Sequence, residues 1–246
     1  MRRRSFVAAA AGLLTAGCSK IAESKLFGGL VDTAERAHRG AHRALGGGGT
    51  ELAPEYTAAD ISPFFRGNGS TDVATPEYRA AEAEGFASWQ LRVGGLVRRP
   101  LVLSLADIRA MPQRTQITRH DCVEGWSAIG QWTGPRLGGM LETAGLQPEA
   151  RYIVFRCADT LGGAPYYESC DLEDAFHPQT IIAHQLNDAP LPVANGAPLR
   201  LRIERQLGYK HAKYLTGIEA VASLEGIGGG GGGYWEDRGY QWYAGI

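Results

Sequence analysis

The chain has 246 residues, enough for one large domain or two small ones and for a well-packed core. Its formal net charge of -1 and charged-residue content of 21% are ordinary for a globular protein. No long basic stripe is present, so the composition excludes an electrostatic reason for a nucleic-acid partner and favours a small molecule or another protein. Four cysteines in a chain of this length also exclude a disulfide-based scaffold.

Residues 1–18 have the pattern of an export signal. Arginines precede a short apolar run that ends in small residues before Cys18, and this run is too short to span a bilayer on its own. The Arg-Arg-Ser-Phe stretch at 3–6 resembles a twin-arginine (Tat) motif, and Ala-Gly-Cys at 16–18 resembles a lipobox, although Thr15 stands where an aliphatic residue is usual. We expect export to the periplasm or the outer face of the cell membrane, with a lipid anchor at Cys18. The alternative is ordinary cleavage and release.

Residues 19–60 are predicted to be a helical spacer and linker. Apolar residues recur three and four apart within 21–45, which is typical of an amphipathic helix, and the glycines at 46–49 end it. His38 and His42 lie one turn apart and could bind a metal. A solvated pair is the simpler interpretation, because no third ligand is nearby in the sequence.

Helix and strand patterns alternate irregularly from Ile61 onward. Short helices are predicted at 105–110 and at 136–144, the second ending at Gly145. Branched and aromatic residues predict strands at 89–93, 100–103, 152–157, 199–204 and 214–222. A Gly94-Gly95 turn is expected between the first two of these strands. A doubly wound fold would show a regular strand–helix period. We therefore expect an α+β domain with a mixed sheet over residues 61–225.

Residues 226–246 contain six consecutive glycines, 228–233, followed by aromatic residues. A phosphate-binding loop needs glycines at fixed offsets between a strand and a helix, whereas an aromatic segment follows here. We interpret the run as a flexible connector that lets an aromatic C-terminal tail fold back onto the domain.

Cys122 lies in the stretch Arg-His-Asp-Cys-Val-Glu-Gly-Trp-Ser at 119–127. Its neighbours Arg119 and His120 are expected to favour the thiolate, which is the form that ligates metals or attacks substrates. These residues alone leave three interpretations open: a soft-metal ligand, a nucleophile and a buried structural thiol. A cysteine-nucleophile hydrolase has weak support, because His120 is its one candidate base and no His-Asn arrangement is recognisable.

A second cluster of candidate residues lies in 191–213. Two strand-like stretches bracket a loop that offers Arg200, Lys210, His211 and Lys213. Cationic side chains that converge beside backbone N–H donors make a good phosphate clamp. The simpler alternative is a basic surface loop, and the combination with Cys122 favours the clamp.

The order and spacing of these motifs resemble the molybdopterin-binding domain of the sulfite oxidase family, from about Ile61 to Ala222. The resemblance rests on Cys-Val-Glu-Gly-Trp-Ser at 122–127, Asn-Gly-Ala-Pro-Leu-Arg at 195–200 and Gly-Tyr-Lys-His-Ala-Lys at 208–213. The first motif looks closest to bacterial periplasmic sulfoxide reductase catalytic subunits. The resemblance implies a molybdenum-cofactor oxidoreductase that transfers an oxygen atom to or from a small or protein-bound substrate, with a sulfoxide as the leading candidate.

The resemblance also implies a set of site residues. Cys122 would be the catalytic residue that binds molybdenum. Asp159 fits the sulfite-oxidising branch, and Cys157 occupies the position that the reductase branch uses. The aromatic residues Trp126, Tyr234, Trp235 and Tyr240 would wall the substrate approach, or else pack in the core. The implied molybdopterin-binding residues are Phe65, Arg66, Asn68, Cys157, Asp159, Asn195, Arg200, His211, Ala212 and Lys213.

Departures from the sulfite-oxidising pattern bear on substrate and partners. Sulfite oxidisers follow the cysteine with an arginine-rich stretch, whereas 123–126 read Val-Glu-Gly-Trp, so sulfite is disfavoured. No haem attachment motif occurs, so a separate electron-transfer protein, such as a membrane haem subunit, is expected. Cys157 and Cys170 are expected to be buried thiols rather than a disulfide. An alternative of another class is an exported lipoprotein that binds a ligand or partner without catalysis, in which Cys122 would be structural.

Overall fold

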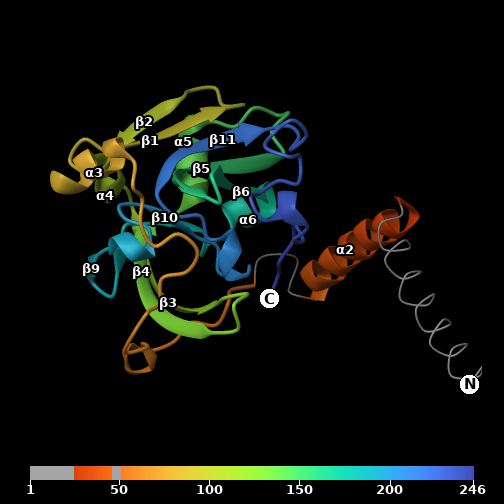
Figure 1. The fold of residues 1–246 in the computed structure, drawn as a ribbon, viewed down its shortest axis with the longest axis horizontal. Helices are drawn as coiled ribbons and strands as arrows, with labels where there is room; N and C mark the ends of the chain where they lie inside the picture. Colours follow the sequence, from red (N-terminus) through yellow and green to blue (C-terminus); the bar gives the residue numbers. More distant parts are fainter. Residues whose placement is uncertain (1–24, 46–50) are drawn as a thin grey trace, which may run out of the picture. The chain divides into compact units, whose positions relative to one another are not determined.

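The computed structural model describes residues 25–45 and 51–246, which belong to two separate units (Figure 1). The first unit, Met1–Gly46, contributes helix α2 (Lys25–Leu45), which confirms the helix predicted there. Within the described ranges, no group of three or more side chains is placed to hold a metal ion, and no helix combines the length and apolarity needed to cross a membrane. The predicted export signal and lipobox lie outside the described residues.

The second unit, Gly47–Ile246, is built on a mixed five-stranded sheet of order β2-β1-β11-β5-β6. Its β1 and β11 are parallel, and the other neighbours are antiparallel, which confirms the predicted mixed sheet. The strands are β1 (Gln90–Gly95), β2 (Leu101–Ser104), β5 (Tyr152–Leu161), β6 (Ala164–Asp171) and β11 (Leu215–Val221).

Two smaller sheets complete the unit. An antiparallel sheet of order β3-β4-β8-β9 contains the long β3–β4 hairpin, and β10 pairs with β7. Their strands are β3 (Gln113–Asp121), β4 (Ser127–Pro135), β7 (Ile181–Ala183), β8 (Gln185–Leu186), β9 (Ala189–Pro190) and β10 (Arg200–Arg202). The α-helices are α3 (Pro76–Ala83), α4 (Leu105–Ala110), α5 (Leu137–Ala144) and α6 (Leu172–Phe176). Single 3₁₀ turns are η2 (Ala58–Asp60), η3 (Val193–Asn195), η4 (Gly208–Lys210) and η5 (Glu236–Arg238).

The five-stranded sheet buries both faces at its centre. Successive side chains of a strand point to opposite faces, so Phe155 enters the main core while Val154 packs with Tyr167 and Tyr234 on the other side. Helix α5 covers the main-core face with Leu137, Met140, Leu141 and Ala144, each at most 1% exposed. Burying a large apolar side chain contributes about 1.5–3 kcal/mol, so these side chains stabilise the packing of α5 against the sheet.

Local signals explain why α4 was predicted with its correct bounds and α5 with its correct C-terminal end. Ser104 caps α4 reciprocally with Asp107, because the Asp107 N–H donates to Ser104 Oγ at 3.1 Å and the Ser104 N–H donates to Asp107 Oδ2 at 2.9 Å. Helix α5 ends at Gly145, which adopts the left-handed conformation (φ +72°) and donates its N–H to the Leu141 carbonyl at 2.8 Å.

The expected Gly94-Gly95 turn is wrong, since both glycines belong to β1 and pair with β11. Gly95 has φ +76°, and a Cβ there would lie 2.3 Å from the Ala220 carbonyl oxygen. The glycine is therefore required by a close approach of two backbones rather than by a chain reversal.

The glycine run 228–233 is organised around one carboxylate. Asp237 accepts hydrogen bonds from the N–H groups of Gly229 and Gly231, both at 2.8 Å, and from Tyr167 Oη at 2.6 Å. The structure thus differs from the expected flexible connector, and the tail that follows donates from Tyr234 N to the Tyr167 carbonyl at 2.9 Å.

Residues 51–60, expected to be linker, also contact the domain. Tyr56 N donates to the Ile117 carbonyl at 2.8 Å, and Ala53 exchanges hydrogen bonds with the Gln179 side chain.

Candidate active site

Cys122 occupies the first position of the tight loop that joins β3 to β4. Its N–H donates to the Trp126 carbonyl at 2.9 Å, and its carbonyl accepts from Gly125 N at 3.0 Å. Gly125 has φ +85°, which permits this closed loop. The thiol is free and 8% exposed. The hairpin therefore holds the sulfur in a fixed place at the wall of a pocket.

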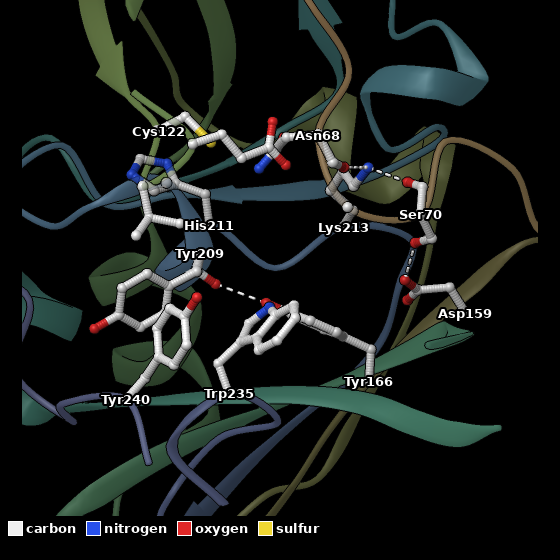
Figure 2. A pocket seen from close by; sticks show the side chains of 14 residues that line it. Asn68, Ser70, Cys122, Asp159, Tyr166, Tyr209, His211, Lys213, Trp235 and Tyr240 are labelled. Atoms are coloured by element: carbon white, nitrogen blue, oxygen red, sulfur yellow. Dashed lines mark hydrogen bonds between the residues drawn. The ribbon is translucent and has the colours of Figure 1, made fainter. Parts of the chain in front are cut away.

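This pocket has three chemically distinct sides (Figure 2). One side carries Cys122 and His211, a second carries polar groups near Lys213, and a third is aromatic. The pocket holds about 670 Å³ of space free of atoms, part of it open to solvent. Its lining residues are Asn68, Gly69, Ser70, Cys122, Val123, Glu124, Asp159, Tyr166, Gly208, Tyr209, His211, Lys213, Trp235 and Tyr240.

The expectation that Arg119 and His120 favour the Cys122 thiolate is wrong. Arg119 pairs with Asp121 at 2.9 Å. Burial, followed by the charge of Arg202, lowers the pKa of His120 well below its ordinary value, so the imidazole is neutral. Burial raises the pKa of Cys122 itself. A thiol in these surroundings is a poor nucleophile, whereas a bound metal ion would displace its proton, so the metal-ligand interpretation is the stronger one.

Arg200 and Lys213 are buried cations that meet neutral partners. Arg200 is 1% exposed and donates to the Asn195 carbonyl at 2.9 Å. Lys213 Nζ donates to the carbonyls of Asn68 at 2.6 Å and Ala194 at 3.3 Å, and also to that of Ser70. Burial, with Arg202, lowers the pKa of Arg200 to about 9, and burial, with Arg200, lowers that of Lys213 to about 7. Both shifts indicate positive charge that an anion would stabilise.

His120 adds an unused donor to this region. Arg202 donates to His120 Nδ1 at 3.0 Å, so the proton of the neutral ring is assigned to Nε2. In the described part of the chain, neither His120 Nε2 nor Arg200 Nε has a hydrogen-bond partner, although both are buried. A Cβ on Gly208 would lie 2.6 Å from His120 Nε2. Buried donors without partners, next to uncompensated cations, fit the anionic phosphate and polar pterin of molybdopterin.

A deeper cation is already neutralised. Arg202 donates to Glu204 through Nε at 2.9 Å and through a terminal nitrogen at 2.5 Å, and both side chains are fully buried. Trp132 lies beneath both guanidinium groups, 4.3 Å from that of Arg202 and 4.9 Å from that of Arg200. The charge of Arg202 is therefore balanced by Glu204, whereas the charge of Arg200 could still pair with a bound anion.

The predicted cofactor-binding residues divide into two groups. Asn68, Asp159, His211 and Lys213 line the pocket with Cys122. The others lie behind or beside it: Phe65 and Ala212 are buried in cores, Asn195 and Arg200 are buried, Cys157 is half-buried, and the Arg66 guanidinium lies 5.8 Å from the Trp126 ring centre.

Of the other residues predicted to belong to the site, some line the pocket and others do not. Trp235 and Tyr240 line the pocket, whereas Trp126 packs against Phe65 and Tyr234 belongs to a core cluster. Lys210 is not part of the clamp, because it forms ion pairs with Glu168 and Glu236. Cys157 and Cys170 are free thiols, as expected.

Sequence reasoning missed several lining residues, among them Ser70, Tyr166 and Tyr209. Ser70 Oγ donates to Asp159, and Tyr166 Oη donates to the Tyr209 carbonyl at 2.7 Å. Tyr166 belongs to β6, a strand that was not predicted, so no local signal pointed to it. Tyr209 lies between motif residues of the second cluster and could have been included.

The fold and this site agree with one class of protein, namely an oxidoreductase that binds an anionic metal cofactor. The family described as "Oxidoreductase molybdopterin binding domain" matches residues 76–225, and the chain belongs to that family. Its cofactor is therefore the molybdenum cofactor, molybdopterin. This result favours the oxidoreductase over the non-catalytic lipoprotein considered above.

Individual relatives support the same assignment. The chain is 39% identical over 195 residues to an Azospira oryzae protein proposed to be the protein-methionine-sulfoxide reductase subunit YedZ1, covering 79% of this chain and 68% of that protein. It is 34% identical to the protein-methionine-sulfoxide reductase catalytic subunit MsrP of Xanthomonas axonopodis, covering 63% of this chain and 51% of the relative. The chain thus spans about half to two thirds of the length of these relatives. The solved sulfane dehydrogenase SoxCD from Paracoccus pantotrophus shares the fold, with TM-score 0.52 and 21% identity over 56% of this chain and 39% of that one.

Proposed function

We propose that this oxidoreductase reduces sulfoxides, including methionine sulfoxide in exported proteins, at the pocket beside Cys122. The observation that carries the proposal is the joint placement of a free, fixed cysteine and of Lys213 and Arg200, two buried cations without carboxylate partners. Relatives named as protein-methionine-sulfoxide reductases support the substrate class.

Cys122 would bind the molybdenum, and Arg200, Lys213 and the His120 Nε2–H donor would hold the anionic and polar parts of molybdopterin. The bound cofactor would supply the two-electron chemistry that removes the oxygen atom from the substrate sulfur. The overall reaction consumes one sulfoxide, two electrons and two protons, and it yields one thioether and one water. Because the chain must receive these electrons from another protein, we also propose a membrane haem subunit as its partner.

Glu124 favours a neutral substrate over sulfite. Its side chain lines the pocket two residues after Cys122, and its Oε2 accepts from Trp126 Nε1 at 2.9 Å. A carboxylate at the pocket wall repels an approaching anion, whereas a sulfoxide carries no net charge. The electrostatics of the wall therefore agree with a sulfoxide.

Export through the twin-arginine route and a lipid anchor at Cys18 complete the proposal. Mass spectrometry of the N-terminal peptide from the membrane fraction tests the anchor, with Cys18→Ala as the control. Recovery of an unlipidated chain from the soluble periplasm would refute it.

The decisive experiment measures molybdenum and pterin in the protein exported through its own signal, together with turnover of N-acetylmethionine sulfoxide by a reduced viologen dye. We expect about one molybdenum per chain, the stoichiometry of a single cysteine ligand. Cys122→Ala should lose turnover while thermal unfolding stays cooperative. Unchanged turnover in Cys122→Ala would refute the assignment of Cys122, and protein free of both metal and pterin would refute the proposed function.

A further inference from the structure

Four aromatic side chains form the side of the pocket that faces Cys122 (Figure 2), and we call them the aromatic wall: Tyr166, Tyr209, Trp235 and Tyr240. We propose that the aromatic wall is the subsite that binds the S-methyl end of the substrate, and that Trp235 and Tyr240 make the enzyme select methionine sulfoxide. This inference rests on the proposed function. Trp235 and Tyr240 lie beyond residues 76–225, so the family match does not include them.

The rings of the aromatic wall pack against one another, and two of its three hydroxyl groups are engaged in hydrogen bonds. Trp235 and Tyr240 have ring centres 5.1 Å apart and tilted by 36°, and Tyr209 meets Tyr240 edge-on at 5.3 Å. The hydroxyl of Tyr166 donates to the Tyr209 carbonyl, and that of Tyr209 donates to the Gln241 carbonyl at 2.6 Å. With the hydroxyls of Tyr166 and Tyr209 engaged, the aromatic wall offers the pocket a polarisable surface made mostly of ring atoms.

Charge separates the aromatic wall from the side that would hold the cofactor. Lys213, Ser70 and Asp159 lie together on a different side of the pocket, joined by hydrogen bonds (Figure 2). An anionic cofactor belongs there, beside the cation. Tyr240 is 38% exposed, so the aromatic side borders solvent.

The chemistry of methionine sulfoxide matches these two sides. Its sulfur and methyl group are soft and apolar, and sulfur and methyl contacts with aromatic rings are favourable. Its oxygen is a strong hydrogen-bond acceptor, which points it toward the Cys122 side and away from the aromatic wall. Sulfite has no apolar end and would gain nothing from such a surface.

The C-terminal tail that carries Trp235 and Tyr240 is firmly attached. Glu236 forms a buried ion pair with Lys210, and Trp242 Nε1 donates to Ser169 Oγ at 2.8 Å. Leu207 N donates to the Ala244 carbonyl at 2.9 Å. The aromatic wall is therefore preorganised, so little ordering accompanies substrate binding.

The test compares holoprotein variants in turnover of N-acetylmethionine sulfoxide by a reduced viologen dye. Tyr240→Ala and Trp235→Leu should raise KM about tenfold, which corresponds to about 1.4 kcal/mol, while kcat stays within about twofold. Tyr240→Phe should keep the wild-type KM, because the ring is retained. Trp242→Phe is the matched control, since Trp242 belongs to the same tail but does not line the pocket. Molybdenum and pterin contents are measured for every variant.

Each outcome of this test either supports or overturns the inference. An unchanged KM in both Tyr240→Ala and Trp235→Leu, with active wild-type protein, overturns the inference and leaves the proposed function standing. Loss of molybdenum or pterin in these variants overturns it as well, because the aromatic wall would then hold the cofactor. An equal rise in KM in Trp242→Phe would also overturn the inference, because the tail would then affect KM through the fold and not through contact with the substrate. Wild-type holoprotein that reduces no sulfoxide refutes the proposed function, and this inference falls with it.

Discussion

Replacing Lys210 by methionine should destabilise the protein strongly, because Lys210 holds together a buried charge cluster. Its Nζ lies 2.6 Å from Glu168 Oε2 and also pairs with Glu236, and the three side chains are at most 2% exposed. Methionine has nearly the length and volume of lysine, so loss of the charge rather than a cavity dominates the effect.

The size of the effect follows from the charge that Lys210 contributes to this cluster. Burial raises the pKa of Glu168 well above its ordinary value, and the charge of Lys210 opposes this rise. Burial alone would lower the pKa of Lys210, but Glu168 and Glu236 outweigh it and raise the pKa. Removing one partner of a buried ion pair costs about 3–5 kcal/mol. We expect Lys210→Met to lose about that much, a large part of the net stability of a domain.

Glu168→Gln is the matched control for this prediction. Glutamine has nearly the size of the glutamate side chain, carries no charge and leaves the pair between Lys210 and Glu236 in place, so the expected loss is clearly smaller than that of Lys210→Met. Urea unfolding of the holoprotein, followed by tryptophan fluorescence, measures both variants. A loss below about 1 kcal/mol for Lys210→Met, or an equal loss for Glu168→Gln, would refute this account of the cluster.

Two more predictions concern pH. Burial, with Arg200, lowers the pKa of Lys213 to about 7, and a bound anion favours the charged ammonium. Retention of molybdopterin should therefore fall as pH rises above this pKa, and Lys213→Met should bind it more weakly with less pH dependence, as measured by pterin fluorescence after gel filtration. Burial works to raise the pKa of Asp237, but hydrogen bonds, first that of Tyr167, outweigh it and lower the pKa. A carboxyl group with a lowered pKa stabilises the fold above its unfolded value of about 3.9, so Asp237→Asn should cost about 1 kcal/mol at neutral pH. Thermal melts should show this difference shrinking as pH falls through the folded pKa.

The elements predicted best are those that local chemistry specifies. Ser104 and Asp107 cap α4 through groups three residues apart, and Gly145 ends α5 through its own backbone conformation. Both signals act within one helical turn, so the sequence contains them completely. The same holds for β5 and β11, whose buried centres are rich in branched and aromatic residues.

The β3–β4 hairpin was missed because its partners are distant in sequence. The buried face of β3 includes Gln116, Thr118 and His120, which would be read as polar and exposed. Gln116 Nε2 donates to Glu204 Oε1 at 2.7 Å, and Arg202 donates to His120, so residues more than 80 positions away satisfy this face. A polar pattern cannot reveal such burial without knowledge of the partners.

The sequence predicted the kinds of side chain at the site, but not which of the two lysines, Lys210 or Lys213, reaches the pocket. Lys210 and Lys213 are three residues apart and are both lysines, so residue type alone does not distinguish their roles. Lys210 is the last residue of the 3₁₀ turn η4 and faces Glu168 and Glu236, whereas Lys213 lies beyond this turn and reaches the pocket. The distinction depends on carboxylates from β6 and from the tail, which no local pattern includes.

Charge balance connects the fold to its cofactor. Arg202 has Glu204 as a buried counterion, whereas Arg200 and Lys213 meet carbonyl oxygens and, for Arg200, the face of Trp132. Buried cations without counterions cost free energy, so an anion that binds them also stabilises the folded state by mass action. The groups that we propose to bind molybdopterin are thus the groups that weaken the cofactor-free fold. A protein of this design is most stable when it folds around its cofactor before export, which agrees with the twin-arginine route that we propose.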